Sequence, residues 1–268
     1  MKTILFDASL CNGCYGCQFA CKDEHCGNDW SPIAAEQPLT GSFWCKMTQE
    51  ERGAVPEVKV SYLPIMCGHC DECELVKQAP DVAYRREDGL VIIDPTKAKG
   101  RRDLVDMCPV HAVYWNEALE LPQKCTGCAH LLDNGWEVPR CVDVCATGAL
   151  KVVDDADVPA EAETLDGVAT LGSHYKVMNY PKRWIYGCFV DREHNEVLIG
   201  AKATLVDGDG NIVSEIETDD FGEFRFKELE DGDYSVRLAA DGFEPVELPA
   251  GIHDKDVVLG DIFAKAAA

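Results

Sequence analysis

The sequence of 268 residues contains no apolar run of the roughly 20 residues that a membrane-spanning helix needs. It also lacks a cluster of lysine and arginine, and its formal net charge is −23. A nucleic acid or an anionic membrane surface would be repelled, so neither is expected as a partner. The N-terminal segment reaches Asp7 after a few apolar residues and has no twin-arginine pair, so we expect no export signal and no membrane anchor.

Recognisable catalytic motifs are missing as well. The sequence has no G-x-S-x-G elbow, no phosphate-binding P-loop and no cysteine–histidine pair in a plausible nucleophilic setting. The segment DGDGN at 207–211 begins like a calcium loop, but Ile212 stands where the loop needs glycine, so a hairpin turn is expected there. We therefore predict no catalytic residue in this chain.

Cysteine is almost absent after residue 145: of 15 cysteines, only Cys188 follows Cys145. Most of the others are two or three residues apart, which is awkward for disulfides and typical of metal ligands in a reducing compartment. A cytoplasmic location is the default expectation, although such a chain could be exported together with a partner.

The first cysteine motif is Cys11, Cys14, Cys17 and Cys21, with C-x2-C-x2-C-x3-C spacing. This spacing is typical of 4Fe-4S proteins, in which three thiolates on one loop bind one cluster and the fourth binds the neighbouring cluster. It differs from the two separated pairs of cysteines that zinc sites usually have. A second motif is therefore expected elsewhere in the chain.

The second motif has the same outer spacings around a longer central gap. Exchange of the fourth ligand between the two motifs predicts two clusters. The first set is Cys11, Cys14, Cys17 and Cys145, and the second set is Cys21, Cys125, Cys128 and Cys141. A zinc ribbon between residues 125 and 145 is the alternative for this motif.

A third set consists of Cys67, Cys70, Cys73 and Cys108. Reading backwards from Cys108 with the ferredoxin spacing gives Leu104, Arg101 and Ala98, where ligands of a fourth cluster would stand, and Lys77 replaces the ligand expected after Cys73. We therefore predict three 4Fe-4S clusters and an erased fourth. The alternative is a zinc ion bound by the first three cysteines with His69 or Cys108.

Three cysteines remain, and we interpret them as buried structural thiols: Cys26, Cys45 and Cys188. Histidines in or beside the motifs could donate hydrogen bonds to cluster sulfur, although ordinary packing is the commoner role. They are His69, His111 and His130.

The fold class predicted is α+β, a duplicated ferredoxin-like cluster domain over residues 1–153 followed by an all-β sandwich. YRRE and LVII flank Asp88-Gly89 and are expected to form a hairpin, and residues 97–107 are expected to form a helix. The segment DDADVPAEAETLDG at 154–167 is acidic and without period, so residues 154–186 are expected to form a linker or a surface excursion. Alternating apolar residues between glycine-rich turns predict the sandwich over residues 187–268, of the carboxypeptidase-regulatory or transthyretin kind.

Several segments resemble a known family: CKDEH at 21–25, YRREDGLVIIDPTKAKG at 84–100, CPVHAVYWNE at 108–117 and QKCTGCAHLLD at 123–133. They are similar to the iron–sulfur subunits of dimethyl-sulfoxide-reductase-type molybdopterin enzymes. Within that family the likeness is to the small subunits of pyrogallol–phloroglucinol transhydroxylases, and TDDFGEFRFKELEDGDYSVRLAADGF at 218–243 extends it to the C-terminal part.

This resemblance implies a heterodimer whose large subunit carries a bis-pterin molybdenum or tungsten site. The present chain would pass electrons to or from it during a reaction on a phenolic substrate, such as a catechol dehydroxylation, with a soluble electron carrier as a further partner. The alternative is a redox-neutral hydroxyl transfer between phenols, in which the clusters have a structural or activating role. The family usually places the third ligand of the middle motif at the position of Leu75, so the ligand role of Cys73 is the least secure.

Overall fold

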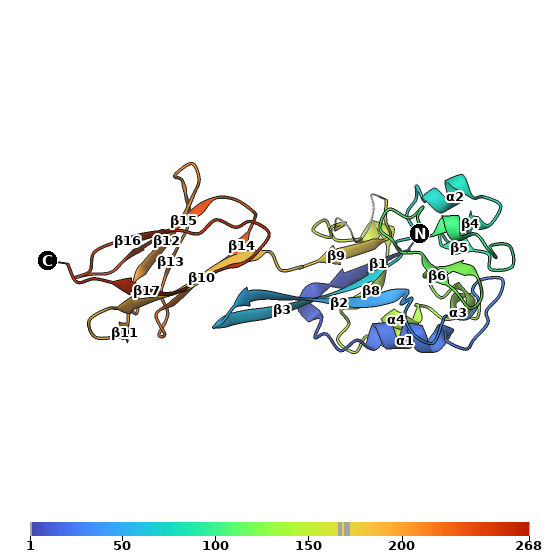
Figure 1. Cartoon of the computed structure of the whole chain (residues 1–268), viewed down its shortest axis with the longest axis horizontal. Helices are drawn as coiled ribbons and strands as arrows, with labels where there is room; N and C mark the ends of the chain where they lie inside the picture. The colour runs from blue at the N-terminus through green and yellow to red at the C-terminus, as the bar shows by residue number, and fades with distance from the viewer. Residues whose placement is uncertain (1, 166–167, 169–171, 268) are drawn as a thin grey trace. The chain divides into compact units, whose positions relative to one another are not determined.

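The computed structural model in Figure 1 describes residues 2–165, 168 and 172–267. The chain divides into two compact units. The first consists of Met1–Gln49 and Tyr62–Tyr180, and the second of Glu50–Ser61 and Pro181–Ala268. The tip of one hairpin, residues 50–61, is therefore part of the second unit although both ends of that hairpin belong to the first.

A three-stranded sheet joins distant parts of the first unit. Its central strand β1 (Lys2–Asp7) pairs antiparallel with β8 (Leu150–Asp154) and parallel with β9 (Tyr175–Met178). β9 lies inside the segment expected as a linker. The pairing brings residues near both ends of the cysteine-rich region to one place, because β1 leads directly into the first motif and β8 follows the last.

Hairpins and short helices carry the rest of the first unit (Figure 1). The hairpin expected around Asp88-Gly89 is confirmed, as β4 (Ala83–Arg85) pairs antiparallel with β5 (Val91–Ile93). The remaining strands and α-helices, of which β2 and β3 lie partly in the second unit, are β2 (Cys45–Ala54), β3 (Glu57–Met66), β6 (Tyr114–Asn116), β7 (Leu121–Gln123), α1 (Gly16–His25), α2 (Glu74–Gln78), α3 (Ala129–Leu132) and α4 (Arg140–Asp143). Helices are thus present but short, and strands predominate among the described residues.

The prediction of a helix over residues 97–107 is wrong. The segment holds only a short 3-10 turn, Arg102–Leu104, because Gly100 adopts a φ of +78°, and its N–H bonds to the carbonyl of Glu120. A left-handed residue ends a right-handed helix, and the apolar side chains that suggested the helix are buried by turns instead.

The second unit is a β-sandwich, as predicted. One sheet contains β10 (Arg183–Asp191), β11 (Glu196–Val197), β14 (Glu223–Leu229) and β17 (Val257–Ala264), and the other contains β12 (Lys202–Asp207), β13 (Ile212–Glu217), β15 (Tyr234–Ala239) and β16 (Val246–Pro249). Alternate side chains from both sheets form one apolar core, including Phe189 and Phe224 from the first sheet and Leu205 and Leu238 from the second. The DGDGN segment is the turn between β12 and β13.

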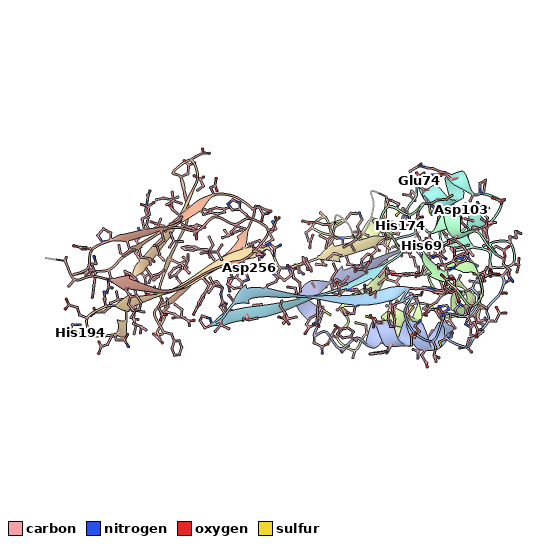
Figure 2. All side chains as sticks on the ribbon, viewed as in Figure 1. His69, Glu74, Asp103, His174, His194 and Asp256 are labelled. Carbon is pink, nitrogen blue, oxygen red and sulfur yellow. The ribbon has the colours of Figure 1, made fainter. Side chains whose placement is uncertain are left out.

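A buried ion pair holds the hairpin tip within the second unit. The Arg52 guanidinium donates to both carboxylate oxygens of Asp256, at 2.9 and 2.7 Å, and to the carbonyls of Pro181 and Lys182. Both side chains of the pair are at most 2% exposed. Figure 2 labels Asp256 just before β17. Across the described residues, no helix has the length and apolar character to cross a membrane.

Candidate metal centres

The cysteines of the first set come together from the two ends of the cysteine-rich region. Cys11 follows β1, Cys17 lies in the first turn of α1, and Cys145 follows α4. Burial is the main cause that raises the pKa of Cys11, and the neighbouring thiols of Cys17, Cys14 and Cys145 add to it. These four predicted ligands therefore form one neighbourhood.

The second set is buried more deeply. Burial raises the pKa of Cys21 well above its usual value, and the next causes are the nearby thiols of Cys125, Cys141 and Cys128. Burial likewise raises the pKa of Cys125 to about 12. Cys21 lies one turn after Cys17 on α1, so this helix supplies a ligand to each of two predicted sets, as ligand exchange between motifs requires.

The third set surrounds a cavity of about 250 Å³, which is lined by Cys67, Cys70, Cys73 and Cys108. The pKa of Cys108 is raised by burial and, further, by the thiols of Cys67 and Cys73. Among the described residues that line this cavity, Lys124 is the only buried one that carries a charge. Cys73 shares this neighbourhood although it stands two residues before the position that the family pattern favours.

The three sets follow one another in space. Cys125 of the second set is close enough to Cys67 of the third for the Cys67 thiol to raise the pKa of Cys125. Between the first and second sets lies Cys45, whose pKa is raised well above its usual value by hydrogen bonding with the Cys141 and Cys17 thiols. Cys45 is 1% exposed and was expected only as a structural thiol. The spacing of the cysteines in the sequence gives no indication that Cys45 contacts two of the predicted sets.

Backbone N–H groups point at the sulfur of one cysteine in each set. Leu150 donates to Cys145 Sγ at 3.3 Å, Gly127 to Cys125 Sγ at 3.4 Å, and His69 to Cys67 Sγ at 3.5 Å. Such donors stabilise thiolates, and thiolates are the ligands that iron–sulfur clusters use. The donor sets therefore fit 4Fe-4S clusters. Within the described ranges, no group of three or more histidine, cysteine, aspartate or glutamate side chains is placed to hold a single metal ion.

Two histidines lie beside the second set. His25 Nε2 is 3.9 Å from Cys128 Sγ, and burial, followed by the charges of His130 and Lys22, lowers the pKa of His25 to about 3. His130 Nε2 is 3.0 Å from a Glu24 carboxylate oxygen. Sequence analysis singled out His130 and missed His25, because His25 follows the first motif and reaches the second only through folding.

The residues of the erased motif lie in a different environment. Ala98 and Leu104 are completely buried and belong to an apolar cluster that also contains Leu75. The guanidinium of Arg101 pairs with Asp103 at 2.9 Å and with Asp81 at 3.1 Å. Hydrocarbon and an exposed ion pair thus occupy the positions at which a fourth set of ligands would stand.

Comparison with known proteins gives the family. Residues 58–155 match the 4Fe-4S dicluster domain, and residues 185–260 match the carboxypeptidase regulatory-like domain. The chain is 37% identical over 273 residues to the pyrogallol hydroxytransferase small subunit of Pelobacter acidigallici, and the match covers 97% of each chain. The chain therefore belongs to this small-subunit family.

Two further relatives match a smaller share of this chain. A subunit of the tetrathionate reductase of Salmonella typhimurium is 31% identical, over 60% of this chain and 61% of the relative. A chain of the anaerobic dimethyl sulfoxide reductase of Escherichia coli is 34% identical, over 54% of this chain and 69% of the relative. The resemblance to iron–sulfur subunits of the dimethyl-sulfoxide-reductase type is thereby confirmed.

Proposed function

We propose that this chain is the electron-transfer subunit of a heterodimeric molybdopterin enzyme that acts on a phenolic substrate, such as a catechol that loses a hydroxyl group. The observation that supports this most is the succession of three cysteine sets in a chain whose likeness to a pyrogallol hydroxytransferase small subunit covers 97% of its length. The large subunit would carry a bis-pterin molybdenum or tungsten site. Catalytic residues would belong to that partner.

Three 4Fe-4S clusters are the proposed cofactors, in a duplicated ferredoxin-like arrangement. The first set, the second set and the third set would each hold one. When bound, these clusters accept and donate single electrons. Cys125 lies near Cys67, and Cys45 lies near both Cys17 and Cys141. These contacts support an electron relay in which the cluster of the second set is the middle one.

The chain's own residues would set the environment of this relay. Burial of Cys21, Cys125 and Cys128 excludes water from the cluster site of the second set. The N–H donors of Leu150, Gly127 and His69 stabilise one thiolate in each set. The apolar cluster around Leu104 occupies the position where a fourth iron–sulfur cluster would be bound, so the proposed relay is short.

Iron and acid-labile sulfide should be counted in the chain isolated without oxygen. Three clusters predict about 12 irons, with an equal amount of sulfide, because each cubane holds four of each. Zinc with little sulfide would contradict the proposal. A count of about eight irons would agree with clusters at the first and second sets and would exclude a cluster at the third.

Partnership can be tested by native isolation under anaerobic conditions. We expect a large subunit that contains molybdenum or tungsten and pterin to co-purify with this chain. Isolation of the chain alone, with its clusters intact, would favour a freestanding ferredoxin. An electron carrier in solution would be recognised by its ability to reduce or oxidise the isolated complex.

A redox-neutral hydroxyl transfer is the second candidate, and the 37% identity to a hydroxytransferase small subunit favours it. The two candidates differ in their need for electrons. The complex should be assayed with a polyphenol in the presence and absence of reduced viologen. Strict dependence on the donor supports reduction, whereas turnover without a donor supports transfer, with the clusters structural or activating.

A further inference from the structure

Lys124 places a buried positive charge beside the third set. It lines the same cavity as Cys67, Cys70, Cys73 and Cys108 and is 2% exposed. Its Nζ donates to the carbonyls of Val91, at 2.5 Å, and Cys125, at 2.9 Å. In the described part of the chain no carboxylate pairs with Lys124. A buried ammonium that meets only carbonyl dipoles keeps a large uncompensated electrostatic potential.

Arg85, the last residue of β4, adds a second positive charge that contacts the loop carrying Cys70. Its guanidinium donates to the carbonyls of His69, Cys70, Asp71 and Gly89. No ion pair of Arg85 with a carboxylate occurs among the residues described. Three consecutive carbonyls of the ligand loop are thus bound by one cation, which holds the loop in place and adds a positive charge next to it.

His69 supplies a neutral donor. Its Nδ1 accepts a hydrogen bond from Val91 N at 2.9 Å, so the ring hydrogen is on Nε2. Nε2 is buried and has no hydrogen-bond partner among the described residues. Figure 2 labels this side chain in the first unit. A buried N–H is seldom left without an acceptor; His69 lines a second cavity together with Cys67, and cluster sulfur held at Cys67 would be such an acceptor.

We propose that Lys124, Arg85 and His69 raise the reduction potential of a cluster at the third set. The inference rests on the proposed function, since it requires a cluster at the third set. Reduction adds one electron to a cluster that is already anionic, and nearby cations and N–H donors stabilise the reduced form more than the oxidised form.

The carboxylates near the third set do little to offset these positive charges. The carboxylates at the rim of the third set are Glu72 and Glu74, whose side chains are 78% and 39% exposed, and both pair with Lys77. Water and this lysine weaken their effect on the third set.

The first test uses the unaltered complex. A dithionite titration followed by EPR spectroscopy gives the order in which the clusters are reduced, and Cys108→Ser identifies the signal of the third set. The titration gives the reduction potential of the third set in the unaltered complex, with which the variants below are compared.

The second test is Lys124→Met, with Lys97→Met as a matched control, because Lys97 is 61% exposed and pairs with Asp94 in the same unit. We expect the reduction equilibrium of the third set to fall at least tenfold in Lys124→Met, which is about 59 mV for one electron. The control should change it less. If Lys124→Met loses iron, Arg85→Gln, which removes the charge and keeps an N–H donor, should lower the same potential.

The outcomes separate this inference from the proposed function. Third-set iron that is absent from the unaltered chain contradicts the proposed ligand set and, with it, the inference. Iron that is present, with a potential that neither Lys124→Met nor Arg85→Gln lowers, overturns the inference alone.

Discussion

The two units bury their apolar side chains in different ways. The second unit has one continuous core, in which Phe189, Leu205 and Leu238 from facing sheets pack together without sulfur. In the first unit the largest cluster contains five buried cysteines, Cys17, Cys21, Cys45, Cys125 and Cys141. Thiols thus stand where a sandwich has hydrocarbon, and the helices and strands around them are short. The first unit should depend on its metal for stability, whereas the second should not.

Removal of iron from the full chain is expected to have the largest effect. Acid and a chelator should abolish hydrogen-exchange protection in β1 and α1, because metal binding contributes directly to folding where thiolates form the core. Protection in β10 and β14 should persist, since their core needs no metal. Mass-spectrometric hydrogen exchange on the intact chain measures both. Equal loss in the two units would refute the contrast.

Substitution of one ligand should act within the first unit only. Cys73→Ser is expected to lose about four irons, because a cubane held by three cysteines is less stable. Cys188→Ser is the matched control, since Cys188 is a half-buried thiol in the sandwich. Iron analysis of both variants decides the matter. An unchanged iron content in Cys73→Ser would remove Cys73 from the third set.

Disruption of the buried ion pair should weaken the second unit without affecting iron. Asp256→Ala leaves the Arg52 guanidinium buried without its carboxylate, which typically costs about 3–5 kcal/mol. Denaturant unfolding of the second unit, followed by hydrogen exchange, measures the loss. The exposed Glu244→Ala should leave stability within about 0.5 kcal/mol. A neutral effect of Asp256→Ala would show that the pair contributes little.

The smallest expected effect is a pH dependence at the surface of the sandwich. A hydrogen bond with Asp191, at 2.6 Å, and then the charge of that carboxylate raise the pKa of His194 above its ordinary value. Because the folded pKa is raised, the contribution is fully present below about pH 6.5 and is lost as the pH rises through the folded value. An NMR titration of the His194 ring should show the raised midpoint, and Asp191→Asn should return it to about 6.5.

Local patterns in the sequence predicted those parts of the fold that local patterns determine. The hairpin around Asp88-Gly89 and the sandwich strands follow from alternation and turn residues. The parallel pairing of β1 with β9 could not be read from the sequence, because nothing near Tyr175 encodes a partner at Ile4. The segment 97–107 was misinterpreted since one glycine in the left-handed region outweighed a helical spacing of buried side chains.

The same limit applies to the candidate site. Spacing alone suggested the three cysteine sets, and the structure brings together thiols within each of them, although the ligand assignment itself stays a prediction. Groups that reach a set from another part of the chain were missed. Cys45 and His25 stand outside the motifs, and Lys124 differs from an ordinary surface lysine only in its burial, which depends on the fold around β5 and the ligand loop.

The hairpin tip bears on how this protein can be divided into fragments. A polypeptide that stops at residue 180 retains Arg52 and loses Asp256 together with both carbonyls that the guanidinium binds. One that starts at residue 181 retains the acceptors and loses the arginine. Each of these fragments therefore lacks one partner of the buried ion pair. A sandwich prepared for crystallisation or NMR should include residues 50–61, joined ahead of residue 181 by a flexible peptide.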